Sequence, residues 1–383
     1  MDEAFREPRE PARAASASDF RLRYRAFLEA YVTPNQEKFR QQRNVDRAVW
    51  AKAGELGLLL PDVPVAYGGM GGSFLDVAAI FEERAAADDR SFGAHVHIIA
   101  ANYILHHGTE EQRHAYLPRL ANGAMVAAIA MTEPHAGSDL RAIRASARRA
   151  GDAYVINGTK TFISNIFIAD LLILAVRTGE GAKDLSLLLV EPRDLPGFEI
   201  VRKLGKLGQT GQDTCEIRFT DARVKTSQLL GLEENCGLRQ LVGELPYERT
   251  IVSVSACATM ERALRLATDY ARERIIQGRP LIEMQNARFK LAECKAKATV
   301  ARVFADHCVR LLSEGALDAA TASIGKLWLS ETEFDVVDEC LQVFGGNGYI
   351  DDHPIGQIFV DARAERIYGG SSEIMKEIIA RSL

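Results

Sequence analysis

Helix-breaking residues and hydroxyl side chains occur together in the segment 130–140. Pro134 and Gly137 do not fit a helix interior, so we expect a loop that presents backbone amides together with the hydroxyls of Thr132 and Ser138. Such a set of hydrogen-bond donors and acceptors suits a polar heteroaromatic ring. Taken alone, a loop of this composition is more often a solvated turn.

An aromatic side chain and a hydroxyl follow in the segment 154–164. Here the Asn157-Gly158 pair predicts a hairpin of two short strands. Alternation along the second strand places Phe162 and Ser164 on one face, where both can contact the same ligand. Without a ligand, Phe162 would be an ordinary core residue.

Two features of the C-terminal half suit close contact with an extended ligand. Gly345, Gly346 and Gly348 permit the backbone to approach a ligand and to adopt positive φ, whereas a helix end accounts for only one glycine. Arg274 lies near the predicted end of a helix, and its planar guanidinium matches the oxygens of a phosphate. An isolated arginine at this position would otherwise be a favourable partner of the helix dipole.

Two carboxylates, Glu244 and Glu248, lie four residues apart and therefore on similar faces of a helix. Pro246 suits the first turn of a helix, where Glu248 would ordinarily be a surface carboxylate that interacts favourably with the helix dipole. In an apolar site the same carboxylate would have a raised pKa and could act as a general base. Spacing alone favours the surface interpretation.

Composition excludes several classes of protein. The net charge of −5, with both signs interspersed, leaves no basic field for nucleic acid. The histidines have no metal-ligand spacing, and no phosphate-binding glycine motif follows a predicted strand. Six scattered cysteines indicate reduced thiols in a cytoplasmic chain. The apolar stretches are too short to span a bilayer, so we expect no membrane insertion.

A change of hydrophobic period divides the chain. Helical spacing near both ends flanks β-type segments that predict a small antiparallel barrel or sandwich, and three long helices near the C-terminus imply an antiparallel bundle. The predicted parts are a flexible tail (1–19), a helical domain (20–125), a β-domain (126–232) and a helical bundle domain (233–383). The long helices are predicted at 253–276, 285–313 and 319–344.

Taken in order, these motifs resemble those of the acyl-CoA dehydrogenases, and the resemblance extends over roughly 20–383. It implies an α+β multidomain fold with an N-terminal helical domain, a central antiparallel β-domain and a C-terminal four-helix bundle, together with the cofactor FAD. The implied FAD contacts are Met131, Thr132, Phe162, Ser164, Arg274, Gln285, Gln342, Val343, Gly345, Gly346, Ser371 and Glu373. The implied substrate contacts are Ser138, Pro246, Tyr247 and Arg249.

One departure from the family concerns its catalytic glutamate, which usually follows the tyrosine of the C-terminal loop. Here Gly369 follows Tyr368, so the backbone amide that binds the thioester carbonyl in the family is kept and the carboxylate is lost. A minority of the family, including the long-chain and isovaleryl-type enzymes, carries its glutamate on the helix after the β-domain. The segment 244–249 resembles that alternative, so the resemblance implies Glu248 as the base, with Glu244 as the next candidate.

The resemblance implies FAD-dependent α,β-dehydrogenation of an acyl-CoA thioester to the trans-2-enoyl-CoA. Glu248 would remove the α-proton while the β-hydride goes to flavin N5. Similar proteins are homotetramers, built as dimers of dimers in which Arg274 contacts the FAD of a neighbouring subunit, and they pass electrons to an electron-transfer flavoprotein. An acyl-carrier-bound substrate, a flavin monooxygenase or oxidase on the same fold, and a catalytically silent flavin-binding protein stay open. His97 would line the acyl pocket or, as we favour, be a satisfied core histidine.

Overall fold

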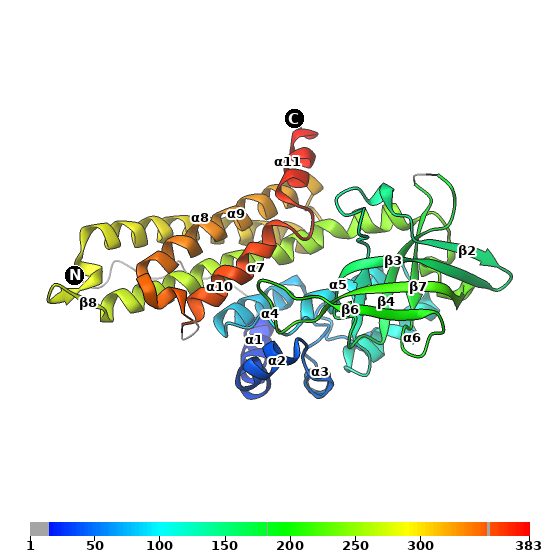
Figure 1. Cartoon of the computed structure of the whole chain (residues 1–383), viewed down its shortest axis with the longest axis horizontal. Coiled ribbons are helices and arrows are strands. Elements are labelled where there is room, and N and C mark those ends of the chain that lie inside the picture. The colour runs from blue at the N-terminus through cyan, green and yellow to red at the C-terminus, as the bar shows by residue number, and fades with distance from the viewer. Residues whose placement is uncertain (1–14, 182, 351–352) are drawn as a thin grey trace.

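Helices at both ends of the chain flank a sheet of seven strands in the computed structural model, which describes residues 15–181, 183–350 and 353–383 (Figure 1). The sheet lies at one end of the molecule, and the long C-terminal helices extend away from it. The predicted α+β architecture of helices, then strands, then helices is confirmed. No helix within the described residues combines the length and apolar composition needed to cross a membrane.

The N-terminal part is helical and is anchored by buried aromatic residues. Its helices are α1 (Ala15–Phe27), α2 (Gln36–Gln42), α3 (Arg47–Glu55), α4 (Phe74–Ala86), α5 (Ala94–His107) and α6 (Glu110–Ala121). Phe20, Tyr24 and Phe27 of α1 are buried in the core that α4 and α5 share. Of the tail predicted over 1–19, residues 1–14 lie outside the described part of the chain. Residues 15–19 are helical, because α1 continues upstream of its buried aromatic anchors.

The sheet is antiparallel apart from two parallel pairings, β1 with β4 and β2 with β4. Its strands are β1 (Ala127–Ala130), β2 (Ser146–Ala150), β3 (Ala153–Ser164), β4 (Leu171–Arg177), β5 (Leu185–Val190), β6 (Phe198–Lys203) and β7 (Thr214–Lys225). They lie in the order β1-β4-β2-β3-β7-β6, and β5, outside this order, also pairs with β4. A buried apolar cluster lies between β4, β5, β3 and β7.

The hairpin predicted at Asn157-Gly158 is wrong, because β3 runs through this pair without turning. The pair instead forms an irregularity in the pairing of β3 with β7, where the register shifts between Ile156 and Gly158. The Asn157 amide exchanges hydrogen bonds of 3.0 and 2.9 Å with Asp221 on β7. At Gly158 a Cβ would lie 2.5 Å from the Cβ of Ala145, so only glycine fits this approach.

The C-terminal part is built on three long helices, α7 (Gly237–Glu273), α8 (Gln285–Ser313) and α9 (Ala319–Phe344). The shorter α10 (Pro354–Ala362) packs against α7 and α9, and α11 (Ser372–Ala380) packs against α9. The bounds predicted for α8 and α9 agree with the structure. Helix α7 ends at Glu273 instead of residue 276, because Ile275–Ile276 pairs with Arg279–Pro280 as the short strands β8 and β9.

Helix α7 also begins 16 residues before the predicted Ser253, so Pro246 lies inside it and not in its first turn. This expectation for Pro246 is therefore wrong. A proline interrupts a helix because it lacks the N–H that would bond the carbonyl four residues earlier. Here that carbonyl belongs to Val242, which is exposed, so water can replace the missing donor. Tertiary packing along the rest of α7 keeps the helix continuous.

Candidate active site

Residues from all three parts of the chain line a cavity of about 240 Å³ where the sheet meets α5 and α7. Six of the predicted site residues lie in its wall: Met131, Thr132, Phe162, Ser164, Glu248 and Gly369. About half of the remaining wall residues are apolar, with Phe81, Val96, Ile99 and Ile251 among them, and the others include Arg84, Arg90 and His95. The structure thus brings the predicted base, the predicted thioester-binding amide and four predicted flavin contacts to one site.

Glu248 faces this cavity from the fourth turn of α7. The Tyr103 hydroxyl on α5 donates a hydrogen bond of 2.9 Å to its Oε1. Burial raises the pKa of Glu248 to about 7, and the nearby Glu244 adds to this effect, whereas Tyr103 and Arg249 oppose it. A carboxyl group with a pKa near neutrality can both accept and release a proton at physiological pH.

Glu244, one turn earlier, does not line the cavity. Its Oε1 lies 2.9 Å from His106 Nδ1 and 3.0 Å from His107 Nε2, on the side of α7 that faces the end of α5. Burial opposes its charge, but the two imidazoles outweigh burial and lower the pKa of Glu244. Of the two carboxylates that the sequence brings forward, only Glu248 is placed to meet a ligand in the cavity.

The loop between Tyr368 and Ser371 is fixed by two buried cations that sequence reasoning did not connect with it. Lys326 Nζ on α9 donates to the Gly370 carbonyl at 2.7 Å, and Arg249 Nε lies 3.5 Å from the Gly369 carbonyl. Gly369 and Gly370 both have positive φ, at 66° and 94°. The hydrogen bonds found among the described residues include none donated by the Gly369 amide, which leaves it available to a thioester oxygen.

On the opposite wall, a buried ion pair positions the loop that follows β1. Lys160 Nζ on β3 lies 2.8 Å from Glu133 Oε1 and donates to the Met131 carbonyl at 2.9 Å. Burial lowers the pKa of Lys160 to about 8. Glu133 also accepts from the amides of Arg144 and Ala145. These bonds hold the backbone of Met131 and Thr132 against β3, beside Phe162 and Ser164.

Other predicted residues lie around this site but outside its wall. Tyr247 is buried and donates its hydroxyl to Asp62 at 2.7 Å, while Ser138 is exposed on the loop after β1. Pro246 is partly buried in α7, and Ser371 and Glu373 lie at the start of α11. Arg249, 2% exposed, contacts the loop at Gly369 and not solvent. His97 is a satisfied core histidine, since Nδ1 accepts from the Ala127 amide and Nε2 donates to the Leu120 carbonyl.

The remaining predicted cofactor contacts lie at the far end of the bundle. Arg274 follows Glu248 by 26 residues, which is about 39 Å of helix at about 1.5 Å per residue. Figure 1 shows β8, next to Arg274, at the opposite end of the molecule from the sheet. This end also carries Gln285 at the start of α8, and Gln342, Val343, Gly345 and Gly346 at the end of α9. One chain does not bring these residues to the cavity that Glu248 faces.

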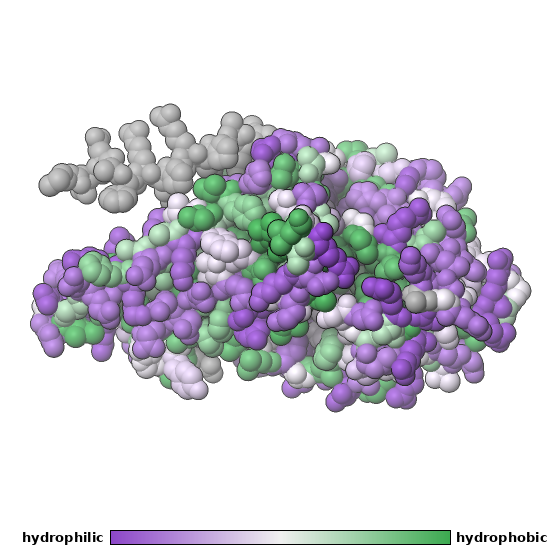
Figure 2. Space-filling view, turned by 90° about the horizontal axis from the view of Figure 1, so that it is seen from above, coloured by the Kyte–Doolittle hydropathy of each residue, from purple (hydrophilic) through white to green (hydrophobic). Residues whose placement is uncertain are grey.

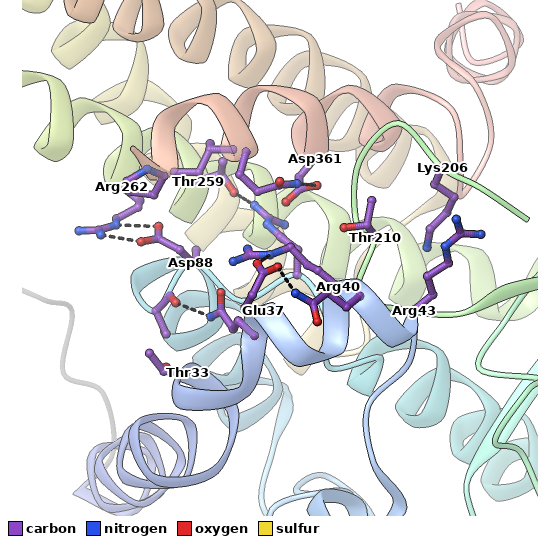
Figure 3. Close-up of a pocket in the computed structure, with 18 of the residues that line it drawn as sticks. Thr33, Glu37, Arg40, Arg43, Asp88, Lys206, Thr210, Thr259, Arg262 and Asp361 are labelled. Carbon is purple, nitrogen blue, oxygen red and sulfur yellow. Dashed lines mark hydrogen bonds and ion pairs between the residues drawn. The ribbon is translucent and has the colours of Figure 1, made fainter. Parts of the chain in front are cut away.

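A larger hollow of about 690 Å³ lies between α2, α10 and the segment 204–210. Figure 3 shows Arg43 and Lys206 on one side of it and the bidentate Arg262–Asp88 pair on the other. None of the predicted site residues lines this hollow. We therefore place the candidate site in the smaller cavity, where the carboxylate with a pKa near neutrality lies.

The exposed aromatic residues of the smaller cavity fit a flat ring system. Phe162 is 68% exposed and Tyr368 37% exposed, although both line the cavity wall. Phe162 has a φ of 60°, which turns it out of the regular alternation of β3. An isoalloxazine ring would cover apolar surface of this kind and find hydrogen-bond partners at Thr132 and Ser164. The residues present therefore fit a flavin.

Comparison with known proteins identifies the family. Models of the N-terminal, middle and C-terminal domains of acyl-CoA dehydrogenases match residues 15–124, 128–222 and 235–383. The mitochondrial long-chain specific acyl-CoA dehydrogenase of Rattus norvegicus is 40% identical over 369 residues, which cover 95% of this chain and 85% of that protein. The crystal structure of an acyl-CoA dehydrogenase from Geobacillus kaustophilus superposes with a TM-score of 0.94 at 37% identity, over 97% of this chain and 98% of the other.

A glutaryl-CoA dehydrogenase from Mycobacterium smegmatis, solved in complex with FADH2, superposes with a TM-score of 0.89 at 25% identity, over 97% of this chain and 95% of the other. The similarity therefore extends to a structure that contains the reduced cofactor. The chain belongs to the acyl-CoA dehydrogenase family of FAD-dependent oxidoreductases.

Proposed function

We propose that this protein catalyses the α,β-dehydrogenation of an acyl-CoA thioester to the trans-2-enoyl-CoA, with Glu248 as the base for the α-proton. One observation carries the proposal: Glu248 and Gly369 line the same cavity as Met131, Thr132, Phe162 and Ser164. FAD, when bound against these last four residues, supplies the acceptor for the β-hydride. The chain itself must supply a base, a hydrogen-bond donor that makes the α-proton of the substrate more acidic, and a site from which water is excluded.

The proton transfer falls to Glu248. Because burial brings its pKa to about 7, a substantial fraction of the carboxyl is ionised at neutral pH, and this form accepts the α-proton. Tyr103 already binds Oε1, so the other carboxylate oxygen is the one left to receive the proton. The apolar residues that line the cavity, including Ile99, Ile251 and Val252, exclude water from an occupied site.

The α-carbon is acidified by the Gly369 amide, which would donate to the thioester oxygen as negative charge develops there. Lys326 and Arg249 hold the two carbonyls of this loop, so the amide is fixed before substrate binds. Arg84 lines the cavity as well, but Asp89 engages it at 2.8 Å in a buried pair. The apolar part of the wall, at Val96, Ile99 and Ile251, suits an acyl chain. A thioester on an acyl carrier protein would present the same reacting atoms.

The proposal includes assembly as a homotetramer, in which one subunit completes the FAD site of another. It is supported by the separation of Arg274 from the cavity, since about 39 Å of helix prevents one chain from offering both to one flavin. Apolar side chains are exposed along α8, at Phe289, Val300 and Val303. Figure 2 shows further hydrophobic side chains near the middle of the face that carries α11. Surfaces of this kind commonly mark contacts between proteins.

Two finer features complete the proposal. The electron acceptor is an electron-transfer flavoprotein, as the family resemblance implies, and the flavin edge beside the exposed Phe162 would be the point of approach. The location is cytoplasmic, which is supported by the absence of disulfides among the cysteines, all of which are free.

The test is the Glu248→Gln variant, which keeps the size and hydrogen-bonding capacity of the side chain and removes its basicity. We expect FAD to stay bound while an acyl-CoA no longer bleaches the flavin absorbance under anaerobic conditions. Glu244→Gln is the matched control, because Glu244 lies on the same helix outside the cavity and should leave bleaching largely intact. Normal bleaching by Glu248→Gln across a panel of acyl-CoA chain lengths would refute the assignment.

A further inference from the structure

One face of α5 is matched to one face of α7 beside the proposed base. Tyr103, His106 and His107 occupy positions i, i+3 and i+4 of α5 and therefore share a face. Opposite them lie Glu248 and Glu244 of α7, four residues apart. Tyr103 binds Glu248 at 2.9 Å, and both imidazoles bind Glu244 at 2.9 and 3.0 Å. Helix α5 thus binds the two carboxylates of α7 separately, Glu248 through Tyr103 and Glu244 through the two imidazoles.

We propose that Tyr103 is a positioning residue for the reaction: its hydroxyl fixes the Glu248 carboxylate and sets its proton affinity. The inference rests on the proposed role of Glu248 and goes beyond it, because it names the group through which a neighbouring helix controls the base. Tyr103 does not line the cavity, so it acts only through Glu248.

The hydrogen bond has a direct geometric consequence. The Tyr103 ring is fully buried, so its hydroxyl has a fixed position, and Glu248 Oε1 is its close acceptor. The only other acceptor within reach among the described residues is the Leu241 carbonyl at 3.5 Å, the outer limit for such a bond. With Oε1 occupied by this donor, Oε2 is the oxygen that takes the α-proton, and the carboxylate does not rotate away from the cavity.

The bond also has an electrostatic consequence. A donor bound to the ionised form favours that form, so Tyr103 holds the proton affinity of Glu248 below the level that burial and Glu244 would impose. The other charged or titratable groups around Glu248 are Glu244 and Arg249 on α7, and Arg84, Arg90, His95 and Tyr368 across the cavity. None of these donates a hydrogen bond to Glu248 in the described structure, so Tyr103 is the one group whose removal leaves the carboxylate without a direct donor.

The decisive variant is Tyr103→Phe, which removes the hydroxyl and keeps the buried ring. A hydrogen bond to a charged group corresponds to roughly one pKa unit or more. We expect the apparent pKa in the pH profile of kcat/KM to rise by about one unit, and kcat near pH 7 to fall about 5- to 10-fold. KM and FAD content should change less than about 2-fold, because Tyr103 touches neither the cavity nor the cofactor contacts.

Tyr24→Phe is the matched control. Tyr24 is also fully buried in the N-terminal helical part, but its hydroxyl has no hydrogen-bond partner among the described residues. Loss of a buried hydroxyl as such should therefore be tolerated, and the pH profile should match that of the wild type. A second probe keeps the shape of the site: 3-fluorotyrosine at position 103 is a stronger donor, so the apparent pKa should fall instead of rising.

The outcomes separate the two proposals. A wild-type pH profile and kcat for both the Tyr103→Phe and the 3-fluorotyrosine enzymes, with Glu248→Gln inactive, would overturn the role of Tyr103 and leave the proposed function intact. A fully active Glu248→Gln enzyme would overturn the proposed function and this inference with it. Opposite shifts of the apparent pKa in the two Tyr103 variants would establish the role, since a purely structural tyrosine predicts no such pair of shifts.

Discussion

The buried ion pair between Lys160 and Glu133 predicts what happens when one partner is removed. Lys160 is fully buried on β3, and its Nζ binds both Glu133 and the Met131 carbonyl, so Lys160→Met removes two bonds at once while keeping most of the volume. Removing one member of a buried ion pair typically lowers the free energy of unfolding by about 3 to 5 kcal/mol. Two backbone amides still bind Glu133, so we expect the lower end, about 3 kcal/mol.

The same substitution should also loosen the loop that carries Met131 and Thr132, because the Met131 carbonyl loses its buried donor. We therefore expect weaker FAD retention together with a lower urea midpoint. The assay is urea unfolding followed by intrinsic and flavin fluorescence, with FAD content measured after gel filtration. The double variant Glu133→Gln with Lys160→Met should recover part of the loss, because it removes the unpaired buried charge.

Arg218→Met is the control on the same sheet. Its partner Glu199 lies 2.9 Å away, but both side chains are about half exposed. The free energy of unfolding should therefore change by about 0.5 kcal/mol or less. The reasoning is refuted if Lys160→Met unfolds at the wild-type urea concentration and retains FAD as well as Arg218→Met does. That result would mean that the amides of Arg144 and Ala145, together with His135 Nε2 at 3.3 Å, satisfy Glu133 without Lys160.

Three further predictions concern the site and its assembly. The rate of reductive flavin bleaching should rise with pH through about 7, because the ionised form of Glu248 is the base. Stopped-flow measurements between pH 5.5 and 8.5 test this, and a rate that does not change with pH would contradict it. Gly370→Ala should lower kcat/KM and reduce the free energy of unfolding by about 1 to 2 kcal/mol, because the φ of 94° at this position disfavours a side chain. Steady-state kinetics and thermal melting measure the two effects, and a variant with wild-type values would contradict the argument from backbone strain. Arg274→Gln mixed with Glu248→Gln should regain activity if one subunit supplies the arginine to the FAD of another; no recovery after subunit exchange would contradict that assembly.

The sequence predicts the order of the elements and the cavity residues better than it predicts local geometry. Helices α8 and α9 match their predicted bounds because their apolar period and terminal glycines agree with their packing. The Asn157-Gly158 turn fails because pairing with β7 along the whole of β3 outweighs a two-residue propensity. The motifs also lead to Glu248, Gly369, Phe162 and Ser164, which meet in one cavity.

The partners that hold these residues could not be predicted in the same way. Lys326 and Arg249 reach the Gly369–Gly370 loop from distant helices, and no local pattern records this contact. Tyr103 lies 145 residues from Glu248 in sequence, and we make no prediction for it from the sequence, although its i, i+3, i+4 spacing with His106 and His107 is a signal for a shared polar face. Distances across the fold decide such contacts, and a single sequence does not contain them.

The early start of α7 bears directly on the chemistry of the proposed base. Had the helix begun near Pro246, Glu248 would lie in its first turn, where the helix dipole stabilises a carboxylate by about 0.3 to 1 kcal/mol and lowers its pKa. Because α7 begins at Gly237, Glu248 lies in the fourth turn, beyond the range of that effect. Burial then raises the pKa of Glu248 to about 7 without opposition from the helix terminus. A continuous helix through Pro246 therefore favours a carboxylate that can take up a proton at neutral pH, and Tyr103, the only hydrogen-bond donor to Glu248 among the described residues, works with Arg249 to limit that rise in pKa.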